Sequence, residues 1–380
     1  MRTLKQIVPL VAAIAALQLL FRFGLGPLWP GVGDRFWLAD NQIDVLQQIS
    51  INAILAFGMT LTILIGGIDL SVGAVLALVG TTTAYILAAA GGDPVERLAI
   101  AGVCAAGALI LFEGVYRFGA PGGKSSPIPW VARALVLLAS LGSAYSFQEG
   151  AGSGTRLVVA VWAGLSVAAC FGLFNGVCAA KTRMPPFIIT LATMEVARGA
   201  ALRFNRGEPM SIPRDNPFLE LGNGRLWGVI PIPVIVMGTI FLVAAVLLHR
   251  TRFGQHLYAM GGNREAARFT GIRLARNEIA VYTICAVLAG VAGMIHAAQL
   301  YSAEPAAGEG FELNAIAASV VGGTSFTGGI GTMGGTFLGA VIIGILNKGL
   351  NQAGVYFSYQ HVVKGLVILA AVWLDVRRRK

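Results

Sequence analysis

Charged residues are scarce in this chain of 380 residues: they make up 12% of it, while hydrophobic residues make up 56% and the mean hydropathy is +0.73. A soluble globular protein carries about 25% charged residues, so the composition excludes a soluble protein of two or three domains. The hydrophobic residues occur in runs of about 20, the length that a helix needs to cross a bilayer. The sequence therefore predicts an all-α, polytopic bundle of transmembrane helices, with residues 1–380 forming a single membrane domain.

The residue patterns of common active sites and metal sites are also missing. The four cysteines lie inside hydrophobic runs and the four histidines have no metal-binding spacing, so no metal site is expected. No G-x-x-x-x-G-K-[ST] sequence occurs, so the chain is not expected to hydrolyse ATP or to bind a cofactor itself. The net charge of +10 comes without a basic stripe interleaved with aromatic residues, which argues against nucleic acid. We predict a protein that is not an enzyme.

The hydrophobic runs predict about 12 membrane segments. Two of them lie in the stretch 93–156, which contains a Gly/Pro/Ser-rich linker at 116–130 and is interpreted as an insertion that adds two spans. The second and the tenth segment run into glycine pairs, so they are candidates for half-helices. The segments are 6–23, 43–65, 72–90, 98–115, 131–147, 157–180, 187–203, 229–248, 279–298, 312–327, 331–350 and 361–376.

The positive charges of the short loops predict the orientation of the chain. With the N-terminus in the cytoplasm, the segment 250–276, with six arginines and one acidic residue, falls inside, as does the basic tail at 377–380. The loop at 299–312, with three glutamates and no lysine or arginine, falls outside. This distribution follows the positive-inside rule. Both termini of this multi-pass protein are therefore predicted to be cytoplasmic.

An internal repeat relates residues 52–82 to residues 314–344. The match is ungapped at an offset of 262, and both copies contain Asn-Ala-Ile followed 14 residues later by Gly-Gly-Ile. Interrupted helices in two related halves point to a transport path, because unwound backbone is tolerated only where it lines a cavity. We predict that residues of both copies line this path. They are Asn52, Gly66, Gly67, Asp69, Ser71, Gly73, Asn314, Gly322, Gly323, Thr324, Ser325, Gly328 and Gly329.

Asp69 is an ionisable residue at predicted membrane depth, where such residues commonly act in transport. In the alternative interpretation, Asp69 and Ser71 only cap the N-terminus of the following helix and touch no substrate. The second copy has Gly331 at the position of Asp69, so the role of this carboxylate is not duplicated. Three further polar residues either line the path or bond between helices: Thr190, Thr193 and Glu195.

The cytoplasmic segment 258–272 carries the signals of a short, well-delimited helix. Asn263 is a good N-cap, Glu265 falls in the first turn, Arg268 falls in the last turn and Gly271 is suited to end the helix. Such a helix on the cytoplasmic face suits the docking of a partner, whereas the alternative is a plain connector with positive-inside arginines. The residues predicted to couple to that partner are Gly261, Gly262, Asn263, Glu265, Ala266, Ala267, Arg268 and Gly271.

Three segments together resemble the ribose/xylose-type permeases of bacterial ATP-binding-cassette (ABC) sugar importers. They are Gly67–Gly73, Tyr258–Ile272, and Glu312–Ala318 with the following Gly322–Ser325. The resemblance covers residues 1–92 and 157–380. It implies a pore formed by two permease copies, a cytoplasmic ATPase docked on the short helix, and a periplasmic or lipid-anchored sugar-binding protein. Magnesium-ATP would belong to the ATPase and not to this chain.

On this resemblance, the chain is expected to be the inner-membrane permease subunit that moves a monosaccharide, such as ribose or xylose, into the cytoplasm by alternating access. Other substrates of the same transporter class are a nucleoside, a signalling sugar or a branched-chain amino acid. An alternative from another class is an ion-coupled secondary transporter, which would need linked ionisable groups near the bilayer midplane and would leave the short helix unexplained.

Overall fold

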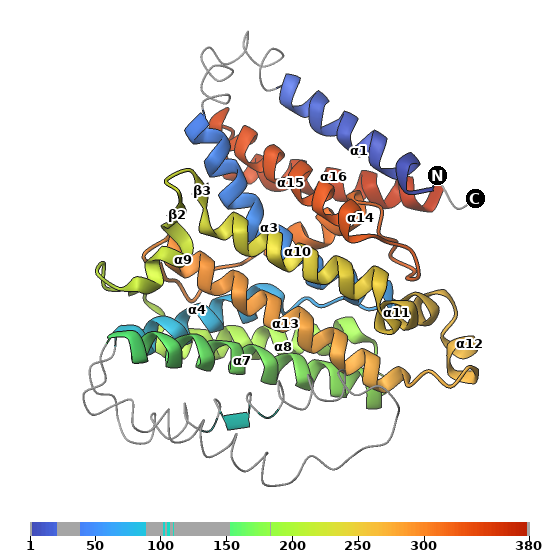
Figure 1. Cartoon of the computed structure of the whole chain (residues 1–380), viewed down its shortest axis with the longest axis horizontal. Helices are drawn as coiled ribbons and strands as arrows, with labels where there is room; N and C mark the ends of the chain where they lie inside the picture. Colours follow the sequence, from blue (N-terminus) through green and yellow to red (C-terminus); the bar gives the residue numbers. More distant parts are fainter. Residues whose placement is uncertain are drawn as a thin grey trace. The chain divides into compact units, whose positions relative to one another are not determined.

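The computed structural model describes residues 2–20, 39–88, 153–182 and 184–377, with a few isolated positions between 102 and 109. The predicted spans at 98–115 and 131–147 lie outside the described residues. Long helices dominate the described ranges (Figure 1). They are α1 (Arg2–Leu19), α3 (Ala39–Leu64), α4 (Val72–Ala88), α7 (Ser153–Lys181), α8 (Pro186–Arg203), α10 (Ile232–Arg250), α11 (Arg252–Gly262), α13 (Leu274–Gln299), α14 (Phe311–Val321), α15 (Met333–Gln352) and α16 (Phe357–Arg377).

Short elements occupy the connections between these helices. Two antiparallel pairs of two-residue strands occur, β1 with β4 and β2 with β3. The short elements are η2 (Phe204–Gly207), β1 (Met210–Ser211), η3 (Pro217–Leu219), α9 (Glu220–Asn223), β2 (Arg225–Leu226), β3 (Ile230–Pro231), α12 (Arg264–Phe269) and β4 (Ser302–Ala303).

The prediction of an all-α, multi-pass membrane protein is confirmed. Five described helices are long and apolar enough to cross a bilayer, and three shorter helices are apolar as well. Each described helix that corresponds to a predicted segment starts and ends within a few residues of it, apart from α14. That helix ends at Val321, six residues before the predicted boundary at 327, so the tenth segment is short, whereas the second segment is a full-length helix, α3.

The chain divides into two compact units, and its interpretation as a single membrane domain stays a prediction. Unit 1 comprises residues 1–69, 225–277 and 310–380. Unit 2 comprises residues 70–224 and 278–309. The first copy of the predicted repeat is thus divided between the units. Its first helix, α3, lies in unit 1, and the helix after the glycine pair, α4, lies in unit 2. The interpretation of 93–156 as an insertion stays a prediction.

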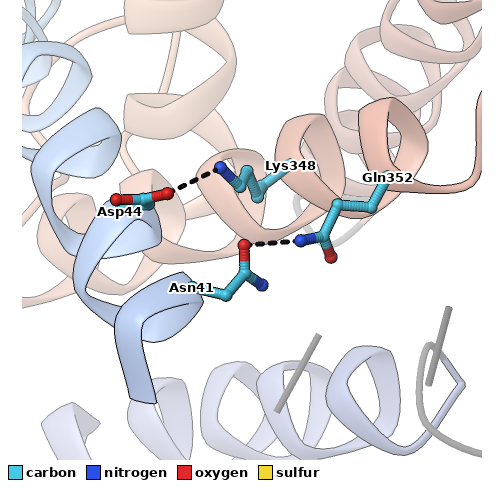
Figure 2. A network of polar contacts seen from close by, with 4 residues as sticks. All are labelled: Asn41, Asp44, Lys348 and Gln352. Atoms are coloured by element: carbon cyan, nitrogen blue, oxygen red, sulfur yellow. Dashed lines mark hydrogen bonds and ion pairs between the residues drawn. The ribbon is translucent and has the colours of Figure 1, made fainter. Parts of the chain in front are cut away.

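In unit 1, α3 and α15 pack antiparallel along their lengths. Near one end, Asp44 of α3 faces Lys348 of α15, with 3.4 Å between the carboxylate and the ammonium, and the Gln352 amide donates to Asn41 (Figure 2). Near the other end, the hydroxyls of Thr60 and Thr336 are 2.6 Å apart. Contacts at both ends fix the register of the two helices.

The half-helix α14 packs against both α3 and α15 in unit 1. Its end lies so close to the start of α15 that a Cβ on Gly335 would overlap the carbonyl oxygen of Gly322. The α14 hydroxyl of Ser319 donates to the carbonyl of Ala56 on α3 at 3.2 Å. Both α3 and α14 therefore run antiparallel to α15 and parallel to each other, as the predicted alternation of spans requires.

In unit 2, the helix α4 is buried along almost its whole length. It runs parallel to α8, because the Leu70 amide donates to the Thr190 hydroxyl at 3.2 Å near one end and the rings of Tyr85 and Phe204 lie 5.4 Å apart near the other. It runs antiparallel to α7, since Asn175 near the end of α7 donates to Ser71, the residue before α4, at 3.0 Å. The end of α4 and the start of α7 are therefore at the same end of unit 2.

Candidate coupling and translocation site

The predicted short helix is present as α12 in unit 1, while its cytoplasmic location stays a prediction. The Asn263 side chain accepts a hydrogen bond from the Ala266 amide at 2.9 Å, which makes Asn263 the N-cap. Glu265 lies in the first turn and Arg268 in the last turn, where a carboxylate and a guanidinium are each favoured by the helix dipole. The sequence prediction for the start and charge pattern of this helix is confirmed.

The end of α12 is a Schellman motif, the glycine-containing helix stop that the sequence predicted. Gly271 has a φ of +82°, its amide donates to the Arg268 carbonyl at 3.1 Å, and the Ile272 amide donates to the Ala267 carbonyl at 3.2 Å. These are the two hydrogen bonds that define the motif. A left-handed backbone is easy for glycine and strained for other residues, so Gly271 fixes where the helix ends.

Sequence reasoning missed the helix that precedes α12. Residues 252–262 form α11, with the Thr251 hydroxyl as N-cap, so Gly261 and Gly262 end a helix and do not lie in a loop. A signal was available, because the buried residues Phe253, Leu257 and Met260 recur at helical spacing behind a threonine. Figure 1 shows α11 and α12 following α10 in the chain.

The helix α12 turns nearly all of its surface outward. Ala267 is buried, whereas Glu265, Ala266 and Arg268 are exposed. Phe269 at its end is 88% exposed. The helix is thus held by its caps and one buried alanine, and presents a mixed charged and aromatic surface.

Gly261 joins the predicted coupling segment to the end of α3 and to the second glycine pair of the repeat. A Cβ on Gly261 would overlap the carbonyl oxygen of Leu64, the last residue of α3, and the backbone of Gly329. The Gly329 amide in turn donates to the Leu64 carbonyl at 2.9 Å. Backbone from α11, from the end of α3 and from the loop before α15 therefore meets at one point in unit 1. We call this point the three-way backbone junction, defined by Gly261, Leu64 and Gly329.

Tyr258 adds a second tie between α11 and the loop before α15. Its hydroxyl donates to the carbonyl of Gly331 at 2.7 Å. Burial raises the pKa of the Tyr258 hydroxyl to about 12, because the ionised form would lose its hydration, so the donor stays protonated at any physiological pH. Sequence reasoning gave Tyr258 no role.

The two copies of the repeat end their first helices at different places. Gly66 has a φ of +79° and closes α3 in a Schellman motif, whereas α14 is closed by Gly323, with a φ of +92°. The sequence alignment pairs Gly66 with Gly328, which lies five residues after Gly323. Gly328 and Gly329 instead lie in the following loop, both with positive φ. The reason is that Gly322 and Gly323 stop α14 before the aligned position.

The other predicted path residues fall into two sets. In unit 1, Asn52 and Asn314 are buried on the parallel helices α3 and α14, and Asp69 and Thr324 are also buried. Ser325 is buried too, with its hydroxyl 3.3 Å from that of Thr327. In unit 2, Ser71 accepts a hydrogen bond from Asn175, and a Cβ on Gly308 would touch the Gly73 carbonyl. Gly67 donates its amide to the Thr62 carbonyl at 2.9 Å.

A buried chain of hydroxyls was also missed by sequence reasoning. Thr60 on α3 donates to Ser319 on α14 at 3.1 Å and lies 2.6 Å from the Thr336 hydroxyl on α15. Ser319 can donate onward to the carbonyls of Ala56 or Ala315. Isolated hydroxyl residues in separate apolar helices give no sequence signal of this kind, because only packing brings them together.

Comparisons with known proteins agree on one family. The family model described as the permease component of branched-chain amino acid transport systems matches residues 41–372, a range that runs through both units. The ribose import permease protein RbsC of Escherichia coli K12 is 38% identical over 348 residues, covering 91% of this chain and 88% of the relative. Its namesake in Bacillus subtilis is 38% identical over 339 residues, covering 89% and 85%. The D-allose transport system permease protein AlsC of Escherichia coli is 33% identical, covering 92% and 87%. No solved structure matches.

Proposed function

The chain belongs to the family of branched-chain amino acid transport system permease components, and on that premise we propose that it is the membrane subunit of an ABC importer for a monosaccharide. We assign it a pentose, such as ribose or xylose. The support for a sugar comes from relatives named as ribose, allose, arabinose and xylose permeases, two of which are at least 33% identical over most of both chains. A nucleoside, a signalling sugar or a branched-chain amino acid would be an outcome of the substrate test below.

The observation that carries the proposal is the three-way backbone junction. An importer of this class must convert a movement of a cytoplasmic ATPase into a movement of its membrane helices. Here the exposed helix α12 follows directly on α11, and Gly261 at the end of α11 abuts Leu64 and Gly329. A displacement of α12 would therefore reach the end of α3 and the loop before α15 through backbone contacts alone, with no flexible side chain between them.

The proposed partners follow from the assignment of ATP hydrolysis to a separate protein. A separate ATPase would dock on the exposed surface of α12, with Phe269 as its apolar anchor and Glu265 and Arg268 beside it. A second permease copy and an external sugar-binding protein would complete the importer. A neutral sugar is held by hydrogen bonds and not by charge, and the buried amides of Asn52 and Asn314 suit that chemistry. Both termini would be cytoplasmic.

Reconstitution in vesicles tests the proposal. The permease is inserted together with its candidate ATPase and binding protein, and uptake of labelled D-ribose, D-xylose, D-allose, L-arabinose, a nucleoside and leucine is followed. We expect uptake of one sugar that requires ATP and all three proteins. Uptake driven by a proton or sodium gradient without the ATPase would contradict the assignment to an ABC importer, and ATP-dependent uptake of leucine alone would contradict the sugar.

The orientation has its own test. Single cysteines placed at 305–310 and at 264–270 are labelled in intact cells with a reagent that does not cross the membrane. We expect labelling at 305–310 only, and labelling at 264–270 only after the membrane is opened. The opposite pattern would reverse the topology and remove α12 from the cytoplasm.

A further inference from the structure

An exposed glutamate lies in the middle of a helix of transmembrane length in unit 2. The helix α8 has 18 residues, about 27 Å at 1.5 Å per residue, and Glu195 is its tenth. One face of α8, including Ile189, Thr193 and Ala197, is buried, and α8 packs on α4. Glu195 is on the other face and is exposed.

The other two charges of α8 have local explanations, whereas Glu195 has none. Arg198 donates to the carbonyls of Pro305 and Ala307 at 2.6 and 2.8 Å, and Arg203 lies in the last turn, where a cation is favoured. Among the residues that the structure describes, no hydrogen bond or ion pair is formed with the Glu195 carboxylate. The described residues of unit 2 therefore offer no local explanation for a charge at this position.

The neighbours of α8 place Glu195 at membrane depth. The antiparallel helix α7 contains a candidate span at Arg156–Lys181, and α4, which runs parallel to α8, is an apolar helix. A carboxylate at that depth is costly against lipid, and such residues face a protein interior or a water-filled cavity. By this rule Glu195 points to a protein interior or a water-filled cavity, on a face of α8 that also carries the exposed apolar side chains of Leu191 and Leu202.

We infer that Glu195 lines the translocation path and accepts hydrogen bonds from the hydroxyls of the sugar as it passes. This inference rests on the proposed function. A carboxylate offers only acceptor oxygens, and a sugar offers several neighbouring hydroxyl donors, so the two groups are complementary without a charge on the substrate. The surface around Glu195 is open to a ligand: Ala192 and Gly199, one turn away on either side, are small, and a Cβ built on Gly199 would meet no atom within 4 Å.

Cysteine accessibility tests the location and the contact together. Glu195→Cys is made in a chain whose four native cysteines are replaced by alanine. The control is Leu242→Cys on α10, where the side chain is 63% exposed among other exposed apolar residues. We expect a water-soluble thiol reagent to label position 195 but not position 242. We also expect D-ribose, or whichever sugar the importer accepts, to slow the labelling at 195. Absence of labelling at 195, or labelling at a rate that no transported sugar changes, would overturn the inference.

A second variant separates this inference from the proposed function. Glu195→Gln keeps the size of the side chain and weakens charge-assisted hydrogen bonding, so sugar uptake should fall about ten- to hundredfold while ATPase binding and membrane abundance stay unchanged. Val196→Ala, on the neighbouring exposed position, should keep full uptake. Uptake at the parental rate in Glu195→Gln would refute the contact while the parent chain still demonstrates ATP-dependent sugar import.

Discussion

The amide of Gly329 donates a hydrogen bond of 2.9 Å to the carbonyl of Leu64. Leu64 is the last residue of the first repeat helix, and Gly329 belongs to the glycine pair of the second repeat, so one backbone hydrogen bond joins the two copies. Gly261 of α11 packs against both residues with no room for a side chain. The proposed coupling segment therefore touches the repeat at a place where its two copies are already joined by their backbones.

Substitution at the end of α11 tests this junction directly. Gly261→Ala would push a methyl group into the Leu64 carbonyl and the Gly329 backbone, which only a backbone shift can relieve, at a cost of about 1–3 kcal/mol. We expect strongly reduced sugar uptake. Gly262→Ala is the matched control, because a Cβ there would meet nothing within 4 Å. Equal uptake by the two variants, measured at equal abundance in vesicles, would refute the role of the junction.

Charge reversal on α12 tests the docking surface. Glu265→Arg should weaken binding of the ATPase, because it replaces an acid in the first helical turn and adds a positive charge to a basic surface. The helix itself should lose only about 0.3–1 kcal/mol from the dipole interaction, so the protein should insert at normal abundance.

The measurement for Glu265→Arg is co-purification of the ATPase together with sugar-stimulated ATP hydrolysis in vesicles. Glu220→Arg, an exposed acid on α9 in unit 2, serves as the control for charge reversal in general. If Glu265→Arg leaves both readouts unchanged, α12 is a plain connector with positive-inside arginines.

The helix stop at Gly271 gives a conformational test. Gly271→Val would force a β-branched residue to a φ of +82°, at a cost of about 1–2 kcal/mol or more, and would unwind or redirect the end of α12. We expect ATPase co-purification to fall while the membrane helices stay folded, as judged by thermal unfolding of the purified permease. Gly238→Val, at an open position in α10, is the control for adding the same side chain. Identical ATPase binding by both variants would show that the geometry of this stop is dispensable.

The buried hydroxyl chain predicts an effect on stability in unit 1. Thr60→Val keeps the shape of the side chain but removes the link between Ser319 and Thr336, so the permease should lose about 0.6–1.7 kcal/mol of stability. Thr336→Val in the same protein should cost less than it does alone, because the shared hydrogen bond is already gone. Thr239→Val on the exposed side of α10, where the hydroxyl bonds only within its own helix, should change the unfolding temperature little. Strict additivity of the first two variants would mean that the hydroxyls act independently.

Most of the helices, and the residues at which α12 begins and ends, could be predicted from the sequence alone. Runs of about 20 apolar residues predict helical spans because a helix satisfies its backbone amides within one segment, and the described helices other than α14 lie where their runs predict. Asn263 and Gly271 cap α12 as expected because capping depends on a few neighbouring residues, a local property that the sequence carries in full. The resemblance to sugar permeases likewise rested on short segments that the sequence displays directly.

Tertiary structure alone decided which of these local features meet. The alignment of the repeat pairs Gly66 with Gly328. The first helices of the two copies instead end at Gly66 and Gly323. In the second copy the helix stops earlier, where Gly322 at the end of α14 packs against Gly335 of α15. The sequence could not place Gly261 on Leu64, nor gather Thr60, Ser319 and Thr336, since those contacts join residues far apart in the chain. The sequence also gave Thr190, Thr193 and Glu195 the same interpretation, as residues that either line the path or bond between helices. Only the burial of one face of α8 separates two inward-facing threonines from a glutamate that points away from the packed core of unit 2.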